Sequence, residues 1–251
     1  MATGFIVNDG SYTWDIEDLL IKRELFNDGN AKTWGYNFYG QLGTNSTANT
    51  SSPVLTIDSG INWKQVTGGF GHTAAIKTDG TLWTWGYNLY GQLGDNTITG
   101  KSSPVTTIAG GTNWKQIACG YYHTSAVKTD GTLWIWGLNN FGQLGTNNTT
   151  NYSSPVTTIA GGTNWKQVTA GVGHTAAIKT DGTLWTWGRN DFAQLGNANT
   201  VSYSSPATTA GGGTNWKQVI AGYYHTAAIK TDGTLWTCLL YTSPSPRDAT
   251  L

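Results

Sequence analysis

The sequence predicts an all-β fold of about four similar blades, each built from four short antiparallel strands. The pentapeptide Asp-Gly-Thr-Leu-Trp starts at positions 79, 130, 181 and 232, a constant spacing of 51 residues. The tripeptide Gln-Leu-Gly starts at positions 41, 92, 143 and 194 and has the same period. A period near 50 residues indicates a repeat architecture, and the lack of a helical pattern between the strand-like runs favours β-propeller blades over an α/β solenoid.

Two strands of each unit form a predicted hairpin, as residues 72–86 illustrate. Asp79-Gly80 lies between two runs rich in apolar residues, threonine and tryptophan, and glycine permits the positive φ that a tight hairpin turn requires. Trp83 and Trp85 lie two residues apart on the second strand, so their side chains leave the same face of the sheet.

The rest of the unit supplies two more strands. A glycine-rich corner at 86–94 is followed by a polar loop, a third run around Ser-Ser-Pro-Val-Thr-Thr-Ile, a Gly-Gly-Thr-Asn turn and a fourth run at 114–118. Pro104 near the start of the third run suits an edge strand, because proline has no N–H to donate to a neighbouring strand.

Residues 69–94 follow the pattern G-x-x-H-T-x-A-x-K-x-D-G-x-L-W-x-W-G-x-N-x-x-G-Q-L-G, which resembles the repeat of the RCC1 (regulator of chromosome condensation) family. The resemblance covers residues 32–237 and implies a propeller, usually of seven blades of roughly 50 residues. Seven units of 51 residues would need 357, more than the 251 present. We therefore expect an open, incomplete arc whose exposed strand edges favour aggregation.

The two ends of the chain do not follow the period, which predicts a leader at 1–31, repeats at 32–237 and a tail at 238–251. In the leader, residues 12–26 are compatible with a short amphipathic helix, either a lead-in packed on the first blade or a docking segment for a larger assembly. In the tail, Cys238-Leu239 stand where the period demands Trp-Gly, and the residues that follow resemble translated vector sequence. We expect this tail to be non-native and exclude it from the functional argument.

The composition excludes several classes of protein. Because 14 Lys and Arg balance 14 Asp and Glu, electrostatic binding to nucleic acid is not expected. No apolar run is long enough to span a membrane, and the amino end lacks the basic start and apolar stretch of a signal peptide. Two cysteines make no disulfide framework. The expected location is the cytoplasm or a virion.

The sequence predicts a protein without an active site, a metal site or a cofactor. The aspartates of the hairpin turns are expected to bond their own backbone, and Cys119 stands where other units have glycine or alanine, which suits a small core residue. Equivalent histidines on successive blades lie along an arc rather than in a metal-binding cluster. We expect each imidazole to bond backbone inside its own blade; the four are His72, His123, His174 and His225.

Positions that differ between copies are the candidate partner-binding residues, because loops on a rigid scaffold commonly carry binding and exposed aromatic side chains make good anchors. Neutral drift at tolerant surface sites is the alternative. These positions follow the Trp-Gly corner or precede the histidine: Tyr36, Phe38, Phe70, Tyr87, Leu89, Tyr121, Tyr122, Leu138, Asn140, Arg189, Asp191, Tyr223 and Tyr224.

Two neighbouring features of the corner are assigned to the scaffold. An aromatic residue recurs in every copy at Tyr39, Tyr90, Phe141 and Phe192, which predicts blade packing. Ala193 replaces the glycine that the other copies have at the start of Gly-Gln-Leu-Gly, so the fourth corner departs from the pattern.

We therefore predict a non-enzymatic interaction scaffold that binds a protein or carbohydrate partner through variable loops, with a viral or bacterial surface component as the favoured source. The alternative that the resemblance implies is guanine-nucleotide exchange on a small GTPase with chromatin association. In that family exchange depends on an inserted wedge, and the constant spacing leaves no room for one. Ultraviolet reception, known for one plant member, is a third reading, but the tryptophan that it requires before the histidine is missing here.

Overall fold

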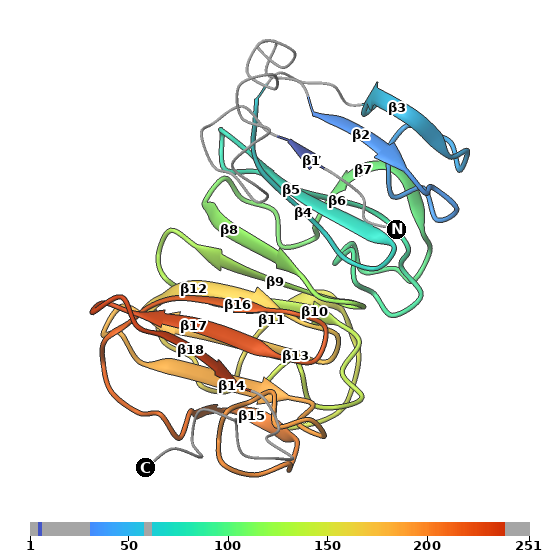
Figure 1. Cartoon of the computed structure of the whole chain (residues 1–251). Helices are drawn as coiled ribbons and strands as arrows, with labels where there is room; N and C mark the ends of the chain where they lie inside the picture. The colour runs from blue at the N-terminus through green and yellow to red at the C-terminus, as the bar shows by residue number, and fades with distance from the viewer. Residues whose placement is uncertain (1–4, 7–30, 58–61, 239–251) are drawn as a thin grey trace.

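The computed structural model describes residues 5–6, 31–57 and 62–238, which form eighteen β-strands in five sheets (Figure 1). These residues contain no helix. Accordingly, nothing in the described ranges is a helix that could cross a membrane. The prediction of an all-β fold of repeated blades is confirmed.

Three sheets are complete blades, in which four antiparallel strands follow one another from the inner to the outer edge. Blade 2 contains β4 (Trp63–Gly68), β5 (His72–Lys77), β6 (Leu82–Gly86) and β7 (Lys101–Thr106). Blade 3 contains β8 (Trp114–Cys119), β9 (His123–Lys128), β10 (Leu133–Gly137) and β11 (Tyr152–Thr157). Blade 4 contains β12 (Trp165–Ala170), β13 (His174–Lys179), β14 (Leu184–Gly188) and β15 (Tyr203–Thr208).

The first and last sheets have three strands each. Blade 1 contains β1 (Phe5–Ile6), β2 (Lys32–Gly35) and β3 (Thr50–Leu55), and blade 5 contains β16 (Trp216–Ala221), β17 (Thr226–Lys230) and β18 (Leu235–Cys238). In blade 1 the leader itself supplies a strand, because β1 pairs antiparallel with β2. The helix predicted at 12–26 and the tail from 239 onward lie outside the described residues.

The hairpin turns form as the sequence predicts. Gly80 has φ +81°, and a Cβ at this position would lie 2.0 Å from the carbonyl oxygen of Thr112, so only glycine fits. The Asp79 carboxylate accepts hydrogen bonds from the Thr81 hydroxyl at 2.7 Å and the Thr81 N–H at 2.9 Å. These bonds hold the pKa of Asp79 below its usual value.

The hydrophobic core lies between neighbouring blades. Trp187 of blade 4 is fully buried and packs against Leu133, Ile135 and Leu144 of blade 3. Its indole N–H donates to the carbonyl oxygen of Gln143 in blade 3 at 2.8 Å. The indoles of blades 2 and 3 make the same bond to the preceding blade, at 2.8 and 2.9 Å. The indole of each complete blade is thus buried against, and hydrogen-bonded to, the preceding blade.

The inner strands add a second link between blades. The side-chain amide of Gln116 in β8 donates to the carbonyl of Val168 in β12 at 3.1 Å and accepts from the Val168 N–H at 3.0 Å. Gln65 makes the same pair of bonds to Ile117. Such paired bonds between side chain and backbone fix the register of one blade on the next.

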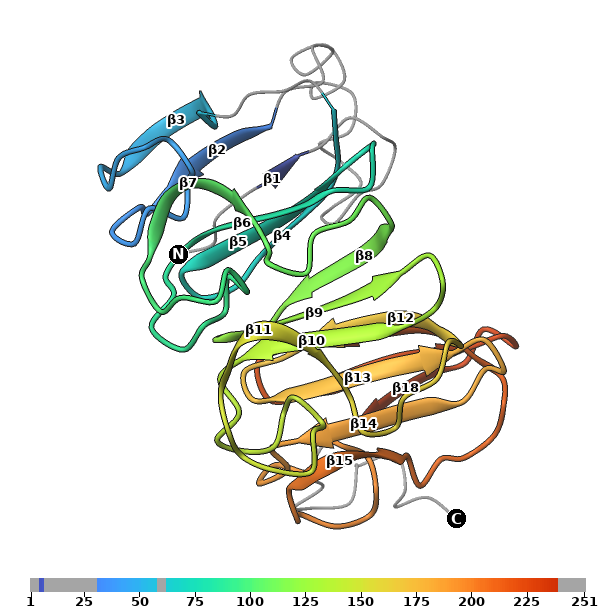
Figure 2. The ribbon, with the colours of Figure 1, turned by 180° about the vertical axis from the view of Figure 1, so that it is seen from behind.

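The blades form an open arc. In both views blade 1 lies in the upper part of the molecule, whereas β18 of blade 5 lies in the lower part, where it overlaps blade 4 (Figures 1 and 2). Within the described ranges, strand pairing stays inside each sheet, and no pairing joins blade 1 to blade 5. The predicted open arc agrees with this arrangement.

Candidate interaction surface

The predicted partner-binding residues lie on one face of the arc. They belong to two kinds of loop, the one joining the first two strands of a complete blade and the one joining its last two. In an antiparallel blade both loops leave the same end of the sheet. Phe70 and Tyr87 show this in blade 2, where they lie in the β4–β5 and β6–β7 loops.

The inner loops bring together rings from alternate and adjacent blades. Phe70 of blade 2 stacks on Tyr121 of blade 3, with ring centroids 4.4 Å apart. Tyr121 also meets the ring edges of Tyr122 at 4.5 Å and of Tyr223, from blade 5, at 5.8 Å. Tyr223 in turn contacts Tyr224 at 4.5 Å. The inner loops of blades 2, 3 and 5 are therefore joined ring to ring.

The outer loops extend this contact toward the first blade. Tyr87 lies 5.6 Å from Tyr122 and 4.7 Å from Tyr39, measured between ring centroids. Tyr90 lies 5.0 Å from Tyr122. The recurrence of Tyr39 and Tyr90 predicts blade packing, and each of these half-buried rings does contact a ring of the next blade. They also lie among the variable rings and belong to the same surface.

Blade 1 contributes the most exposed ring. Phe38 is 65% exposed and stacks on Tyr36 with ring centroids 6.2 Å apart. Both rings contact Tyr39, at 5.1 Å for Phe38 and 6.3 Å for Tyr36. Blade 1 is therefore continuous with the rings of blade 2.

Blade 4 adds a charge to this surface. The guanidinium of Arg189 lies over the rings of Phe141 at 4.8 Å, Tyr224 at 5.1 Å and Phe192 at 5.5 Å. Its Nε donates to the Asp191 carboxylate at 2.7 Å. Cation–π contact and the ion pair together hold Arg189 flat on the rings.

We name this surface the aromatic face. Its rings come from all five blades: Tyr36, Phe38, Tyr39, Phe70, Tyr87, Tyr90, Tyr121, Tyr122, Phe141, Phe192, Tyr223 and Tyr224. Burial and neighbouring phenols raise the pKa of Tyr122 to about 12. At neutral pH this phenol is therefore protonated and can donate a hydrogen bond.

The remaining predicted residues lie at the margin of the aromatic face. Leu89 is 54% exposed and lines a depression of about 380 Å³ together with Tyr39, Tyr87 and Ile98. Leu138 is half-buried, and the side chain of Asn140 accepts a hydrogen bond from Gln143 at 3.3 Å. Neither residue adds a ring to the aromatic face.

Three of the four histidines bond across blades, which corrects the prediction that each would bond backbone inside its own blade. The Nε2 of His72 lies 2.9 Å from the hydroxyl of Thr124, and the Nε2 of His123 lies 3.0 Å from that of Thr175. Burial lowers the pKa of both imidazoles to about 3. They are neutral structural groups at neutral pH.

The surroundings of the Cys119 thiol do not suit nucleophilic catalysis. Desolvation raises the pKa of the Cys119 thiol to about 12, so the thiolate needed for nucleophilic attack does not form at neutral pH. Across the ranges that the structure describes, no three His, Cys, Asp or Glu side chains gather into a possible metal site.

Comparison with known proteins places these blades in a family. The family model of the RCC1-like domain matches residues 24–238. The chain is 34% identical over 206 residues to the ultraviolet-B receptor UVR8 of Arabidopsis thaliana, covering 80% of this chain and 47% of the receptor. It is 32% identical over 188 residues to the probable E3 ubiquitin-protein ligase HERC4 of Homo sapiens, covering 73% of this chain and 18% of HERC4. The chain therefore spans about half or less of these relatives.

A solved structure gives the same fold. Yeast RCC1 (Prp20), in its crystal structure with Kap60, matches 90% of this chain and 56% of its own with a TM-score of 0.74 at 20% sequence identity. At this identity the likeness concerns the fold alone. Together with the family match over residues 24–238, it shows that the chain belongs to the RCC1-like domain family.

Proposed function

We propose that the chain is a non-enzymatic interaction module that binds a protein partner through the aromatic face. The observation that carries the proposal is the continuity of that face, in which rings from five blades contact one another. Protein interfaces are enriched in aromatic residues and arginine at their centre, and such residues commonly dominate the binding energy. Phe38 at 65% exposure and Tyr223 at 53% exposure are the anchors most open to a partner.

The composition of the face favours a protein over a carbohydrate. Leu89 and Ile98 are exposed aliphatic side chains beside the rings, and they suit apolar contacts with another protein. Many of the rings meet edge to face, as Tyr121 does with Tyr223, so they do not present a row of parallel flat faces on which sugar rings could stack.

The relatives support a binding role. A light receptor and a probable ubiquitin ligase have unrelated named activities, yet both contain a segment similar to this chain. A domain shared by proteins of unrelated activity is expected to supply recognition, with the reaction residing elsewhere in each protein. We expect the module to act in the cytoplasm or on a virion.

The test requires a partner that depends on the aromatic face. Proteins captured by the purified chain would be identified, purified and titrated against it by calorimetry. The double variant Phe38→Ala/Tyr223→Ala should weaken binding at least about tenfold. The double variant Thr129→Ala/Thr180→Ala, in the hairpin turns at the opposite end of the blades, should bind as the unchanged chain does.

Four outcomes would overturn the proposal. Binding that survives the Phe38→Ala/Tyr223→Ala substitution, or that is lost equally in the hairpin-turn control, would place the partner elsewhere. Binding to a glycan array in place of a protein, sensitive to the same variants, would assign the face to carbohydrate. Release of bound nucleotide from a small GTPase by the purified chain would assign guanine-nucleotide exchange, for which the regular blades described above offer no inserted wedge.

A further inference from the structure

The end of the blades opposite the aromatic face, which we name the hairpin end, carries an excess of positive charge. In the described residues of blades 2 to 5 it holds eight lysines and four aspartates: Lys64, Lys77, Lys115, Lys128, Lys166, Lys179, Lys217 and Lys230, with Asp79, Asp130, Asp181 and Asp232. The end that carries the aromatic face holds two cations and two anions in the same blades: Lys101 and Arg189, with Asp95 and Asp191. The net charge of these blades therefore lies at the hairpin end.

Four of the lysines form a row along the inner strands, which we name the lysine arc. They occupy the second position of β4, β8, β12 and β16, and all are exposed: Lys64, Lys115, Lys166 and Lys217. In blades 2 to 4 the glutamine after each lysine bonds the backbone of the next inner strand, as Gln167 donates to the carbonyl of Val219 at 3.1 Å. The four lysines therefore lie at the same level on neighbouring strands.

A β-bulge is present at each lysine of the arc. In β12, Trp165 pairs with Lys179 and Gln167 pairs with Ile178, so Lys166 is an extra residue with no partner in β13. The same shift of register occurs in β4, β8 and β16. A bulge re-aims a side chain relative to the regular alternation of a strand, so the four bulges direct four lysines in the same way.

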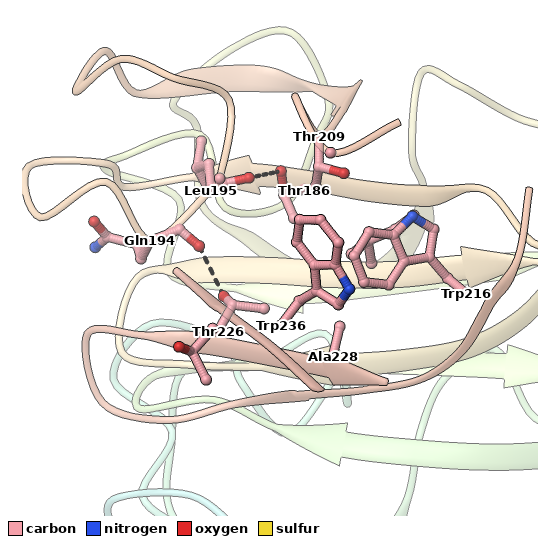
Figure 3. Close-up of a pocket in the computed structure, with 12 residues that line it drawn as sticks. Thr186, Gln194, Leu195, Thr209, Trp216, Thr226, Ala228 and Trp236 are labelled. Carbon is pink, nitrogen blue, oxygen red and sulfur yellow. Dashed lines mark hydrogen bonds between the residues drawn. The ribbon is translucent and has the colours of Figure 1, made fainter. Parts of the chain in front are cut away.

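The tryptophan before each lysine fixes the other side of the strand. Trp216 is 4% exposed, and its indole N–H donates to the Gly212 carbonyl at 2.9 Å. Figure 3 shows its ring beside that of Trp236, in the interior between blades 4 and 5. In blades 3 and 4 neighbouring blades cover both faces of the sheet, so Lys115 and Lys166 reach solvent only at the inner edge or the end of the blade.

We propose that the lysine arc binds a flexible acidic segment of another protein. A row of ammonium groups attracts carboxylates and selects partners of opposite charge. Neighbouring sheets pack about 10 Å apart, so four lysines on successive blades extend over roughly 30 Å. An extended peptide of about twelve residues spans roughly 40 Å and can follow the whole row.

The hairpin turns favour a peptide over a nucleic-acid duplex. The Asp130 carboxylate accepts from the N–H and the hydroxyl of Thr132, and these bonds hold the pKa of Asp130 below its usual value. Each turn aspartate is therefore charged at neutral pH, and each turn joins the second and third strands, outside the inner strand. A wide duplex would bring its phosphates against these carboxylates, whereas a single acidic strand can remain on the inner edges.

The probe that tests the site is a fluorescent peptide of about twelve glutamates, titrated against the full chain by fluorescence anisotropy. Binding should be saturable in about 50 mM NaCl and largely lost in about 0.5 M NaCl, where ionic attraction is screened. A glutamine peptide of equal length should not bind, because it has no carboxylates. Phe38→Ala/Tyr223→Ala should bind the glutamate peptide unchanged, which separates this site from the aromatic face.

Variants of the arc test the role of its charges. Lys115→Gln/Lys166→Gln should weaken binding at least about fivefold, whereas Lys115→Arg/Lys166→Arg keeps both charges and should bind as the unchanged chain does. The matched single variants are Lys166→Gln, which should weaken binding about twofold or more, and Lys101→Gln at the other end of blade 2, which should not.

Three results would overturn the proposal. The first is the absence of saturable binding of the glutamate peptide in low salt. The second is an equal loss of binding in Lys166→Gln and Lys101→Gln. The third is tighter binding of a DNA duplex than of the peptide, weakened by the same arc variants, which would assign the arc to nucleic acid.

Discussion

The Nε2 of His123 in blade 3 lies 3.0 Å from the Oγ1 of Thr175 in blade 4. The Thr175 hydroxyl donates its hydrogen to the Gln143 carbonyl at 2.8 Å, so it must accept from His123. The imidazole is therefore the tautomer protonated at Nε2. Its Nδ1 is buried and has no hydrogen-bond partner among the described residues. A second proton on Nδ1 would place a charge and an unpaired donor inside the junction between blades.

The free energy of unfolding should fall in mild acid because the histidines buried between blades become protonated on unfolding. Burial lowers the pKa of His72 and His123 to about 3 and that of His174 to about 4, whereas unfolded histidine titrates near 6.5. A depressed pKa contributes stability above the unfolded value that is lost as pH falls toward the folded value. Between pH 7.5 and pH 5, each histidine should cost about 2 kcal/mol in the free energy of unfolding, measured by urea denaturation.

Two histidine variants check the origin of this pH dependence. His123→Gln should remove about a third of the loss between pH 7.5 and pH 5, since one of three buried imidazoles is gone. His225→Gln should leave the loss unchanged, because His225 is exposed in blade 5. The pKa values of the hairpin aspartates such as Asp79 lie below their usual value near 4, so these carboxylates stay charged across this range. An equal effect of both variants would contradict the assignment.

The glutamine side chains of the inner strands should contribute unequally to the free energy of unfolding. Gln116→Leu leaves the N–H and carbonyl of Val168 without their partner, which should lower the free energy of unfolding by about 1–3 kcal/mol. Gln218 occupies the equivalent position in blade 5 and is exposed, so Gln218→Leu should change stability by less than about 0.5 kcal/mol. Urea denaturation of the two variants measures both losses in the free energy of unfolding. Equal losses would show that the hydrogen bonds to the next blade are not the cause.

The corner of blade 4 should tolerate and even favour glycine. Ala193 has φ +58°, a conformation that costs a non-glycine residue about 1–2 kcal/mol. Its backbone nevertheless keeps the turn, with Ala193 N–H donating to the Asn190 carbonyl at 2.9 Å. Ala193→Gly should stabilise the chain by about 0.5–1 kcal/mol, because the relief of strain exceeds the added entropy of the unfolded chain.

The reverse exchange in blade 3 is the matched test of this corner. Gly142 has φ +78°, and a Cβ there would lie 2.4 Å from the Cα of Ser204 in blade 4. Gly142→Ala should therefore destabilise by more than about 2 kcal/mol, since backbone of the next blade must move in addition to the strain. Denaturation midpoints that shift in the same direction for Ala193→Gly and Gly142→Ala would refute this account.

The sequence was sufficient to predict the repeated blades, because strand alternation, turn glycines and a constant period determine them. It placed the variable residues in loops but did not predict that these loops leave the same end of the blades. It could not predict which blade satisfies each polar side chain. His123 and Gln116 recur in almost identical copies, so the pattern does not distinguish a partner in the same blade from one 52 residues further along. The recurrence of Tyr39 and Tyr90 predicts their packing between blades, whereas their second place, among the variable rings, needed the structure.

A lysine held between two indoles offers the last prediction. The Nζ of Lys128 lies 4.6 Å from the ring centroid of Trp114 and 4.7 Å from that of Trp134. Lys128→Met keeps the aliphatic stem and removes the charge, so it should lower the free energy of unfolding by about 0.5–2 kcal/mol. Measured in 1 M NaCl, where attraction to the exposed Asp130 is screened, the loss should persist. The control Lys115→Met, at an exposed position of β8, should change the free energy of unfolding by less than about 0.5 kcal/mol. If the loss caused by Lys128→Met disappears in 1 M NaCl, the indole rings do not contribute to it.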